Sequence, residues 1–230
     1  MTRLLFVVVF VFLLLTEPFA QERLGKIIQF VGDVDITSLS TGKRFIPDIG
    51  TTIQRDYRIR TGKKSFVEIL LNNGTKIFIK EITVLNVSNL RMKASDPPTR
   101  LKMLTGKIRI IVKKIFKERT LILKTPTTVA GVRGTDFGVI ASKYETKVVV
   151  FTGKVEVANS NKDIIKSYIL RDREEVTVKE NEPPMQPRVV PADILDSWFD
   201  FYEIDEKNQI IIRSDKDESF IDKFLRKRDF

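Results

Sequence analysis

Apolar and polar residues alternate with a period of two along most of the chain. The alternation is clear in residues 24–37, around Gly32, and in two runs at 66–71 and 76–80 that flank Asn73-Gly74. Alternation of this kind is typical of half-buried strands, and Asn-Gly between two apolar runs is a strong hairpin signal. Helical periodicity is not found before residue 190. The chain is therefore predicted to be all-β, with about a dozen short antiparallel strands in two packed layers, as a sandwich or a β-roll.

One tripeptide, Thr-Gly-Lys, recurs beside these strands. It begins at Thr41, Thr61, Thr105 and Thr152, and a strand-like run follows each copy within a few residues. The spacing is irregular, so the copies do not indicate a solenoid of fixed period. They predict that the fold uses the same turn chemistry several times.

The pattern changes after residue 180. The domain is predicted to span 21–180, and the four prolines in 181–191 indicate a linker or a strap over the surface. Residues 192–230 are predicted to form a small, mainly helical tail with one short strand at 209–213, and with a second helix at 219–228. Trp198 and Phe199 are expected to pack this tail onto the domain, and docking into a partner is the alternative. The helical spacing is carried by Ile194, Leu195, Trp198, Phe199 and Tyr202.

The first 20 residues have the features of a secretory signal peptide. Arg3 precedes an unbroken apolar run at 4–15, and Pro18-Phe19-Ala20 precedes Gln21. The run is shorter than the roughly 20 residues that a membrane-spanning helix needs. We expect cleavage near Ala20 and a periplasmic or otherwise exported mature protein.

Composition excludes several kinds of chemistry. The 230 residues include no cysteine and no histidine, which excludes disulfides, thiolate and imidazole metal ligands, and any Ser-His-Asp triad. No phosphate-binding loop or G-x-S-x-G motif occurs. Asp33 and Asp35 are expected to lie on a solvated strand face rather than to form a calcium site or an acid–base pair. We therefore predict a protein that is not an enzyme and has no cofactor or metal; a hydrolase that works through carboxylates alone is the alternative.

Positive charge is concentrated in one segment. The chain has a net charge of +10, and residues 91–124 hold 11 Lys/Arg and 2 Asp/Glu, a balance of +9. Lys107 and Arg109 are two residues apart and so share one face of a strand. We expect a solvated strand face, with binding of acidic glycan or lipid headgroups as the alternative; nucleic acid is not expected in an exported protein. The predicted basic patch consists of Lys107, Arg109, Lys113, Lys114, Lys117 and Arg119.

Residues 124–137 are the stretch around which the rest is organised. They separate two strand-like runs at 119–124 and 137–141, and Pro126 cannot donate to a ladder. Gly131 and Gly134 would supply unusual backbone angles. Arg133 is expected to hydrogen-bond carbonyls inside the fold or to pair with Asp136, with anion or partner binding as the alternative. Asp136 is expected to cap a turn rather than to join an acid pair. The stretch is predicted to pass the chain from one layer to the next.

This stretch resembles the hallmark of the FecR domain family, in which T-P is followed, after a short spacer that here contains Ala130 and Gly131, by R-G-T-[ED]-F. Further likenesses lie at 59–75, 104–108 and 150–157, so that the resemblance covers about residues 25–178. The matching hallmark residues are Thr125, Pro126, Gly131, Arg133, Gly134, Thr135, Asp136 and Phe137.

The resemblance implies an exported FecR-like binding or sensing module that acts through contact with another envelope protein. A structural or adhesive protein that binds acidic glycan or lipid headgroups through the basic segment is the alternative. Family members that regulate iron-citrate uptake carry a cytoplasmic segment that meets a sigma factor. Only Met1 to Arg3 precede the apolar run here, so neither that role nor iron signalling is expected.

Overall fold

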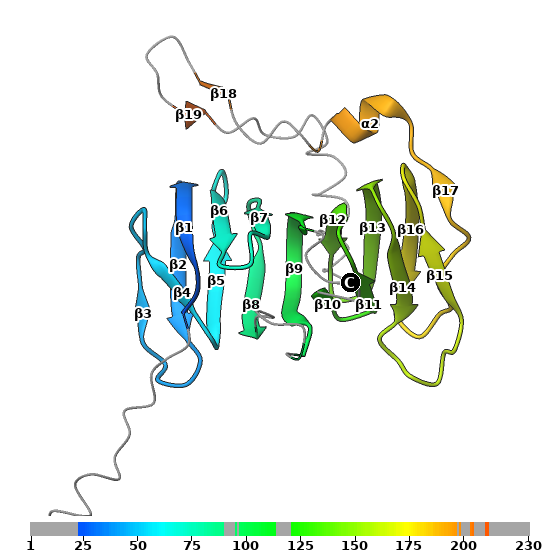
Figure 1. The fold of residues 1–230 in the computed structure, drawn as a ribbon, viewed down its shortest axis with the longest axis horizontal. Helices are drawn as coiled ribbons and strands as arrows, with labels where there is room; N and C mark the ends of the chain where they lie inside the picture. The colour runs from blue at the N-terminus through cyan, green and yellow to red at the C-terminus, as the bar shows by residue number, and fades with distance from the viewer. Residues whose placement is uncertain are drawn as a thin grey trace, which may run out of the picture.

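The computed structural model describes residues 23–89, Ser95, 97–113, 121–196, Trp198, 203–204 and 210–211. Nearly all of these residues lie in strands or in the turns between them (Figure 1). The strands stand side by side in series along the long axis, from β3 at one end of the molecule to β15 and β17 at the other. The prediction of an all-β fold is confirmed.

The strands form two sheets, which we name A and B, and β9 belongs to both of them. Every neighbouring pair is antiparallel except β9 and β10, which are parallel. In order across the sheet, sheet A consists of β4 (Thr52–Gln54), β1 (Arg23–Val31), β6 (Phe66–Leu71), β7 (Lys76–Ile79), β9 (Thr99–Ile111), β12 (Asp136–Ala141), β13 (Glu145–Thr152), β16 (Glu174–Lys179) and β17 (Arg188–Val189). Sheet B consists of β3 (Arg44–Phe45), β2 (Val34–Ser38), β5 (Tyr57–Thr61), β8 (Val84–Asn89), β9, β10 (Leu121–Lys124), β11 (Thr128–Val132), β14 (Val155–Asn159) and β15 (Ser167–Leu170).

The chain passes between the sheets at sharp bends. In β9 the bend lies at Gly106, where φ is +109° and where a side chain would overlap Thr83. Thr105 still pairs with β8 of sheet B, whereas Gly106 already pairs with β12 of sheet A. Three of the four Thr-Gly-Lys copies, those starting at Thr61, Thr105 and Thr152, lie at such bends, and the copy at Thr41 lies in the turn between β2 and β3. The repeated tripeptide therefore marks reused turn chemistry.

The two sheets enclose one hydrophobic core. Alternate residues of both sheets point into it, among them Ile69 and Ile108 of sheet A and Ile59 and Met103 of sheet B, all fully buried. The remaining residues of each strand point away from the core. Each sheet therefore presents an outer face, which we call face A and face B.

The prediction of a mainly helical tail is not supported. Its described part has one short helix, α2 (Ala192–Asp196), followed by Trp198 and by the paired strands β18 (Glu203–Ile204) and β19 (Ile210–Ile211). Apolar residues at helical spacing also occur in irregular segments that pack one side against a domain. The prediction from this spacing was therefore longer than the helix that the structure shows. Phe199, Tyr202 and the second predicted helix lie outside the described residues, as does the predicted signal peptide.

The segment before this tail joins the domain. β17 lies within the predicted Pro-rich linker and pairs with β16, so that Glu174 is opposite Val189. None of the helices in the described ranges is both long and apolar enough to cross a bilayer.

Candidate functional site

The threonines of the hallmark stretch connect the two sheets. The Thr125 and Thr127 hydroxyls each lie 2.8 Å from the Thr146 hydroxyl on β13, and the Thr127 hydroxyl also lies 3.0 Å from the Val178 carbonyl oxygen on β16. All three threonines are at most 2% exposed. The turn between β10 and β11 of sheet B is thereby fixed to sheet A, and these side chains are not available to a ligand.

The second half of the hallmark builds a bend from sheet B to sheet A, as the sequence predicted. Gly134 adopts a φ of +57°, whereas Gly131 lies within β11 and is not at a positive φ. The Thr135 hydroxyl lies 2.9 Å from the Lys154 carbonyl oxygen and accepts a hydrogen bond from the Lys154 N–H at 3.2 Å. Phe137 is fully buried in the core. Four of the eight hallmark residues therefore have evident structural roles at the bend or in the sheet contacts: Thr125, Gly134, Thr135 and Phe137.

Asp136 does not cap a turn. It lies in β12, and Arg109 on the neighbouring strand β9 donates two hydrogen bonds to its carboxylate, from Nε to Oδ1 at 2.9 Å and from Nη2 to Oδ2 at 2.6 Å. Two parallel bonds of this kind are the strongest geometry for such a pair. Arg133, which was expected to be a candidate partner of Asp136, has an exposed side chain. The sequence missed this pair because its members lie 27 residues apart.

The predicted basic patch is not a solvated face at the two residues that were expected to define it. Lys107 and Arg109 do share face A, but they are only 4% and 8% exposed. The Lys107 ammonium lies 4.4 Å from the centre of the Trp198 ring, and the Arg109 guanidinium lies 4.9 Å from that of Phe151. The tail and β13 therefore cover these cations. Lys114, Lys117 and Arg119 lie outside the described residues.

Trp198 is the centre of a second apolar cluster on face A. Its ring lies edge-on to Phe151 at 5.7 Å and sits directly over Gly138, where any side chain would overlap the indole. Ile140, Val149, Val190 and Leu195 complete the cluster. Trp198 thus packs on the domain, as expected, and Leu195 of the tail packs there with it.

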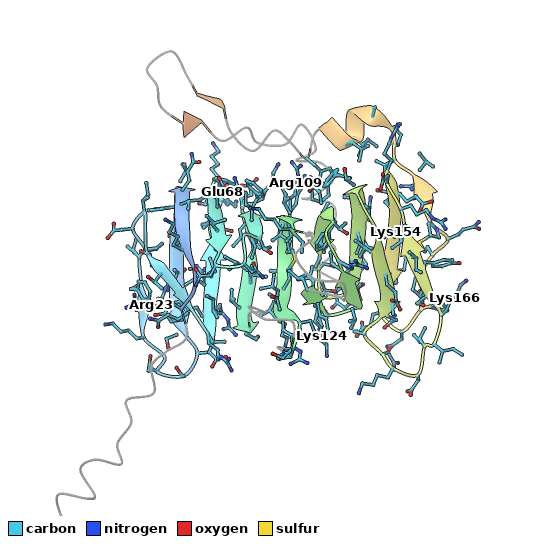
Figure 2. All side chains as sticks on the ribbon, in the orientation of Figure 1. Arg23, Glu68, Arg109, Lys124, Lys154 and Lys166 are labelled. Atoms are coloured by element: carbon cyan, nitrogen blue, oxygen red, sulfur yellow. The ribbon has the colours of Figure 1, made fainter. Side chains whose placement is uncertain are left out.

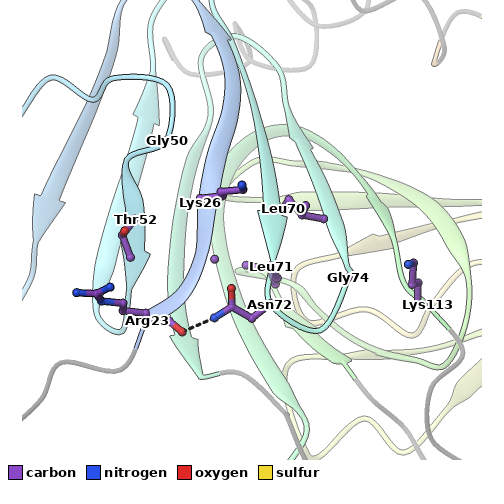
Figure 3. Close-up of a pocket in the computed structure, with 10 residues that line it drawn as sticks. Arg23, Lys26, Gly50, Thr52, Leu70, Leu71, Asn72, Gly74 and Lys113 are labelled. Atoms are coloured by element: carbon purple, nitrogen blue, oxygen red, sulfur yellow. Dashed lines mark hydrogen bonds between the residues drawn. The ribbon is translucent and has the colours of Figure 1, made fainter.

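Lys113, the remaining described member of the predicted patch, lines a surface pocket of about 410 Å³ (Figure 3). The pocket lies beside the hairpin between β6 and β7. Among the described residues that line it, the other cations are Arg23 and Lys26 and there is no carboxylate. The Asn72 side-chain amide donates a 2.7 Å hydrogen bond to the Arg23 carbonyl oxygen and closes one side.

Face B carries a different set of cations, which the sequence did not group together. The strand registers place Arg58, Asn86, Lys102 and Lys124 opposite one another on the neighbouring strands β5, β8, β9 and β10. They form one row across the sheet, which we call the cationic row. Lys102 and Lys124 are exposed, and Figure 2 shows Lys124 well apart from Arg109 of face A.

The surroundings of the cationic row are also basic. Arg100 lies two residues from Lys102 on the same strand and is exposed. Asp35, one of the two predicted solvated carboxylates, is instead only 6% exposed, and lies 2.8 Å from Arg44 and 3.3 Å from Arg60. Among the described residues, no ion pair joins Arg100, Lys102 or Lys124 to a carboxylate. The described ranges also contain no group of three acidic side chains that could hold a metal ion.

Comparisons with known proteins agree with this architecture. Residues 57–156 match the family model described as FecR protein. Two crystal structures, each described as "a putative anti-sigma factor from Parabacteroides distasonis", have a similar fold, both with a TM-score of 0.51 and 19% sequence identity. The similarity covers 64% of this chain in both cases, and 68% and 67% of the two solved chains. A search of the curated proteins found no match.

Proposed function

We propose, from the FecR domain that this chain carries at residues 57–156, that the protein is an exported sensing module that acts by binding another protein of the cell envelope. The FecR domain and the fold shared with the anti-sigma-like structures indicate a regulatory or sensing role. The export and the protein partner are our proposal, and they rest on the predicted signal peptide and on that family.

The proposal rests on the structural role of the family hallmark in this fold. The matched region runs from β5 to β14 and includes both sheets and the bends at Gly106 and Gly134. Thr125 and Phe137 are buried, and Asp136 is engaged by Arg109. The hallmark therefore provides a rigid support, and recognition is left to the outer surfaces and the segments around it.

A direct sigma-factor contact is not part of the proposal, although structures of similar fold are described as anti-sigma factors. The predicted signal peptide would remove this chain from the compartment in which sigma factors work. The module would instead receive or hold a signal on the outer side of the membrane.

The test is fractionation followed by affinity capture. The full-length gene, with a C-terminal tag, is expressed in a Gram-negative host; we expect the product in the periplasmic fraction, with a new N-terminus near Gln21. Crosslinking and capture at low and raised salt should recover one defined envelope protein in both conditions. Retention of Met1 with the chain in the cytoplasm would contradict export, and capture of no defined protein would contradict the sensing role.

A further inference from the structure

We infer that face B binds a linear acidic polysaccharide along the cationic row. This site is separate from the protein contact proposed above. Two of its residues, Lys102 and Lys124, lie in the basic segment 91–124, but none belongs to the predicted basic patch or to the hallmark residues.

The residues of the cationic row are regularly spaced across the sheet. Arg58, Asn86, Lys102 and Lys124 come from four strands, so the row crosses three strand spacings of ~4.8 Å, or about 14 Å. The Arg58 Nε donates a 3.1 Å hydrogen bond to Oδ1 of the Asn86 side chain, which orients the guanidinium along the row. The backbone registers fix the positions of Lys102 opposite Asn86 and of Lys124 opposite Lys102. Regularly spaced donors in a straight line match a ligand with regularly spaced charges.

Positive charge predominates on this part of face B. The outward residues of β2, β3, β5, β8, β10 and the first half of β9 include one carboxylate, Asp35, which Arg44 and Arg60 already neutralise. Lys102 and Lys124 face each other across the parallel strands and both are exposed. Like charges placed opposite each other in a sheet repel, and an anion bound between them removes the repulsion. On these strands, face B thus holds six cations and one carboxylate, and a further carboxylate of the face, Glu156, lies two strands from β10 on β14. The six cations are Arg44, Arg58, Arg60, Arg100, Lys102 and Lys124.

The composition of the cationic row indicates the kind of partner that it can bind. Protein interfaces usually centre on buried aromatic or aliphatic anchors, with charges at the rim. The cationic row consists of one amide and three charged side chains and contains no aromatic residue. A base-stacking platform would also need aromatic residues. A flexible chain with a carboxylate on each repeating unit needs only the charges and the flat face.

The experiment measures binding of polygalacturonate fragments by titration calorimetry. The probe is a carboxylated polysaccharide, and its methyl-esterified form is the matched neutral ligand. We expect wild-type protein to bind fragments long enough to span the row, but not the galacturonate monomer or the esterified polymer. A K102Q/K124Q variant should lose about tenfold in affinity, as expected for two exposed charge contacts.

The control variant K26Q/K179Q removes the same charge from exposed positions in sheet A, on β1 and β16. We expect its affinity to stay within about twofold of wild type, and all variants to keep the wild-type melting temperature. Equal losses in both double variants would overturn the inference in favour of a non-specific charge effect. Tighter binding to poly-glutamate, or to phosphatidylglycerol vesicles, would overturn it in favour of an acidic protein or a membrane surface.

Discussion

The two outer faces of the same sandwich treat charge in opposite ways. On face A, the carboxylates of Glu68, Asp136 and Glu175 each lie within ion-pair distance of a cation, and the side chains of Lys107 and Arg109 are covered. On face B, Arg100, Lys102 and Lys124 are exposed and have no carboxylate partner in the described ranges. Strand β9 contributes to both faces, so one strand supplies buried cations at one end and exposed cations at the other.

This difference separates the charges that are paired within the fold from the charges that are available to a ligand. A cation held between a carboxylate and an aromatic ring has already exchanged its water shell for protein partners, and a further ligand would have to displace them. An exposed, unpaired lysine keeps its water shell and contributes little to stability. The paired and covered charges of face A are therefore part of the architecture, and the exposed lysines of the cationic row on face B are available to a ligand. The predictions below test that contrast.

Removal of Arg109 should have the largest effect. We expect R109A to lower the free energy of unfolding by about 3 kcal/mol, because Asp136 would remain without its partner at the base of the tail. The measurement is urea denaturation followed by circular dichroism. The control is R60A on face B, which leaves Asp35 paired with Arg44, and which should cost less than about 1 kcal/mol. Equal losses would show that the two faces are not different in this respect.

A side chain at position 138 should displace the tail. We expect G138A to cost about 1–3 kcal/mol, since its methyl group would occupy the space of the indole. Trp198 is the only tryptophan in the chain, so its fluorescence should shift to longer wavelength as the ring becomes exposed. A158V adds carbon to the open face B and should leave the spectrum unchanged. An unshifted spectrum in G138A would mean that Trp198 does not rest on Gly138.

Loss of the Lys107 charge should have a smaller effect. K107M retains the length of the side chain but removes the ammonium 4.4 Å from the Trp198 ring. We expect a loss of about 1 kcal/mol in chemical denaturation, the size of a partly desolvated cation–π contact. K166M removes the exposed ammonium that lies 5.1 Å from the Tyr168 ring, and should have no measurable effect. If K107M is as stable as wild type, the cation–π contact contributes nothing measurable, and the stability of this part of face A comes from its ion pair and apolar contacts.

The smallest effect on stability is expected on the cationic row itself. K102Q/K124Q should stay within about 0.5 kcal/mol of wild type, because surface substitutions away from paired groups seldom change stability more. Thermal denaturation at low salt measures it. A loss above about 1 kcal/mol would mean that these lysines support the fold, and that the contrast between the faces is weaker than we propose.

Sequence alone predicted the all-β class and many of the strands and turns, but not β11 (Thr128–Val132), which lies inside the stretch predicted to be a bend. Alternation, the Asn73-Gly74 hairpin and the repeated Thr-Gly-Lys are local signals, because side-chain direction in a strand has a period of two and turn residues act on their own backbone. The hallmark also predicted the bend at Gly134. These features depend on residues that are close together in the chain.

The tertiary structure decided which charges meet. Arg109 and Asp136 are 27 residues apart, and the members of the cationic row come from strands between Tyr57 and Lys124. Which residues stand opposite one another depends on strand order and register, and β9 changes sheets at Gly106, so that Lys102 and Lys107 face opposite sides of the molecule. The charge density of residues 91–124 predicted a basic surface, but only the fold could separate its buried cations from its exposed ones.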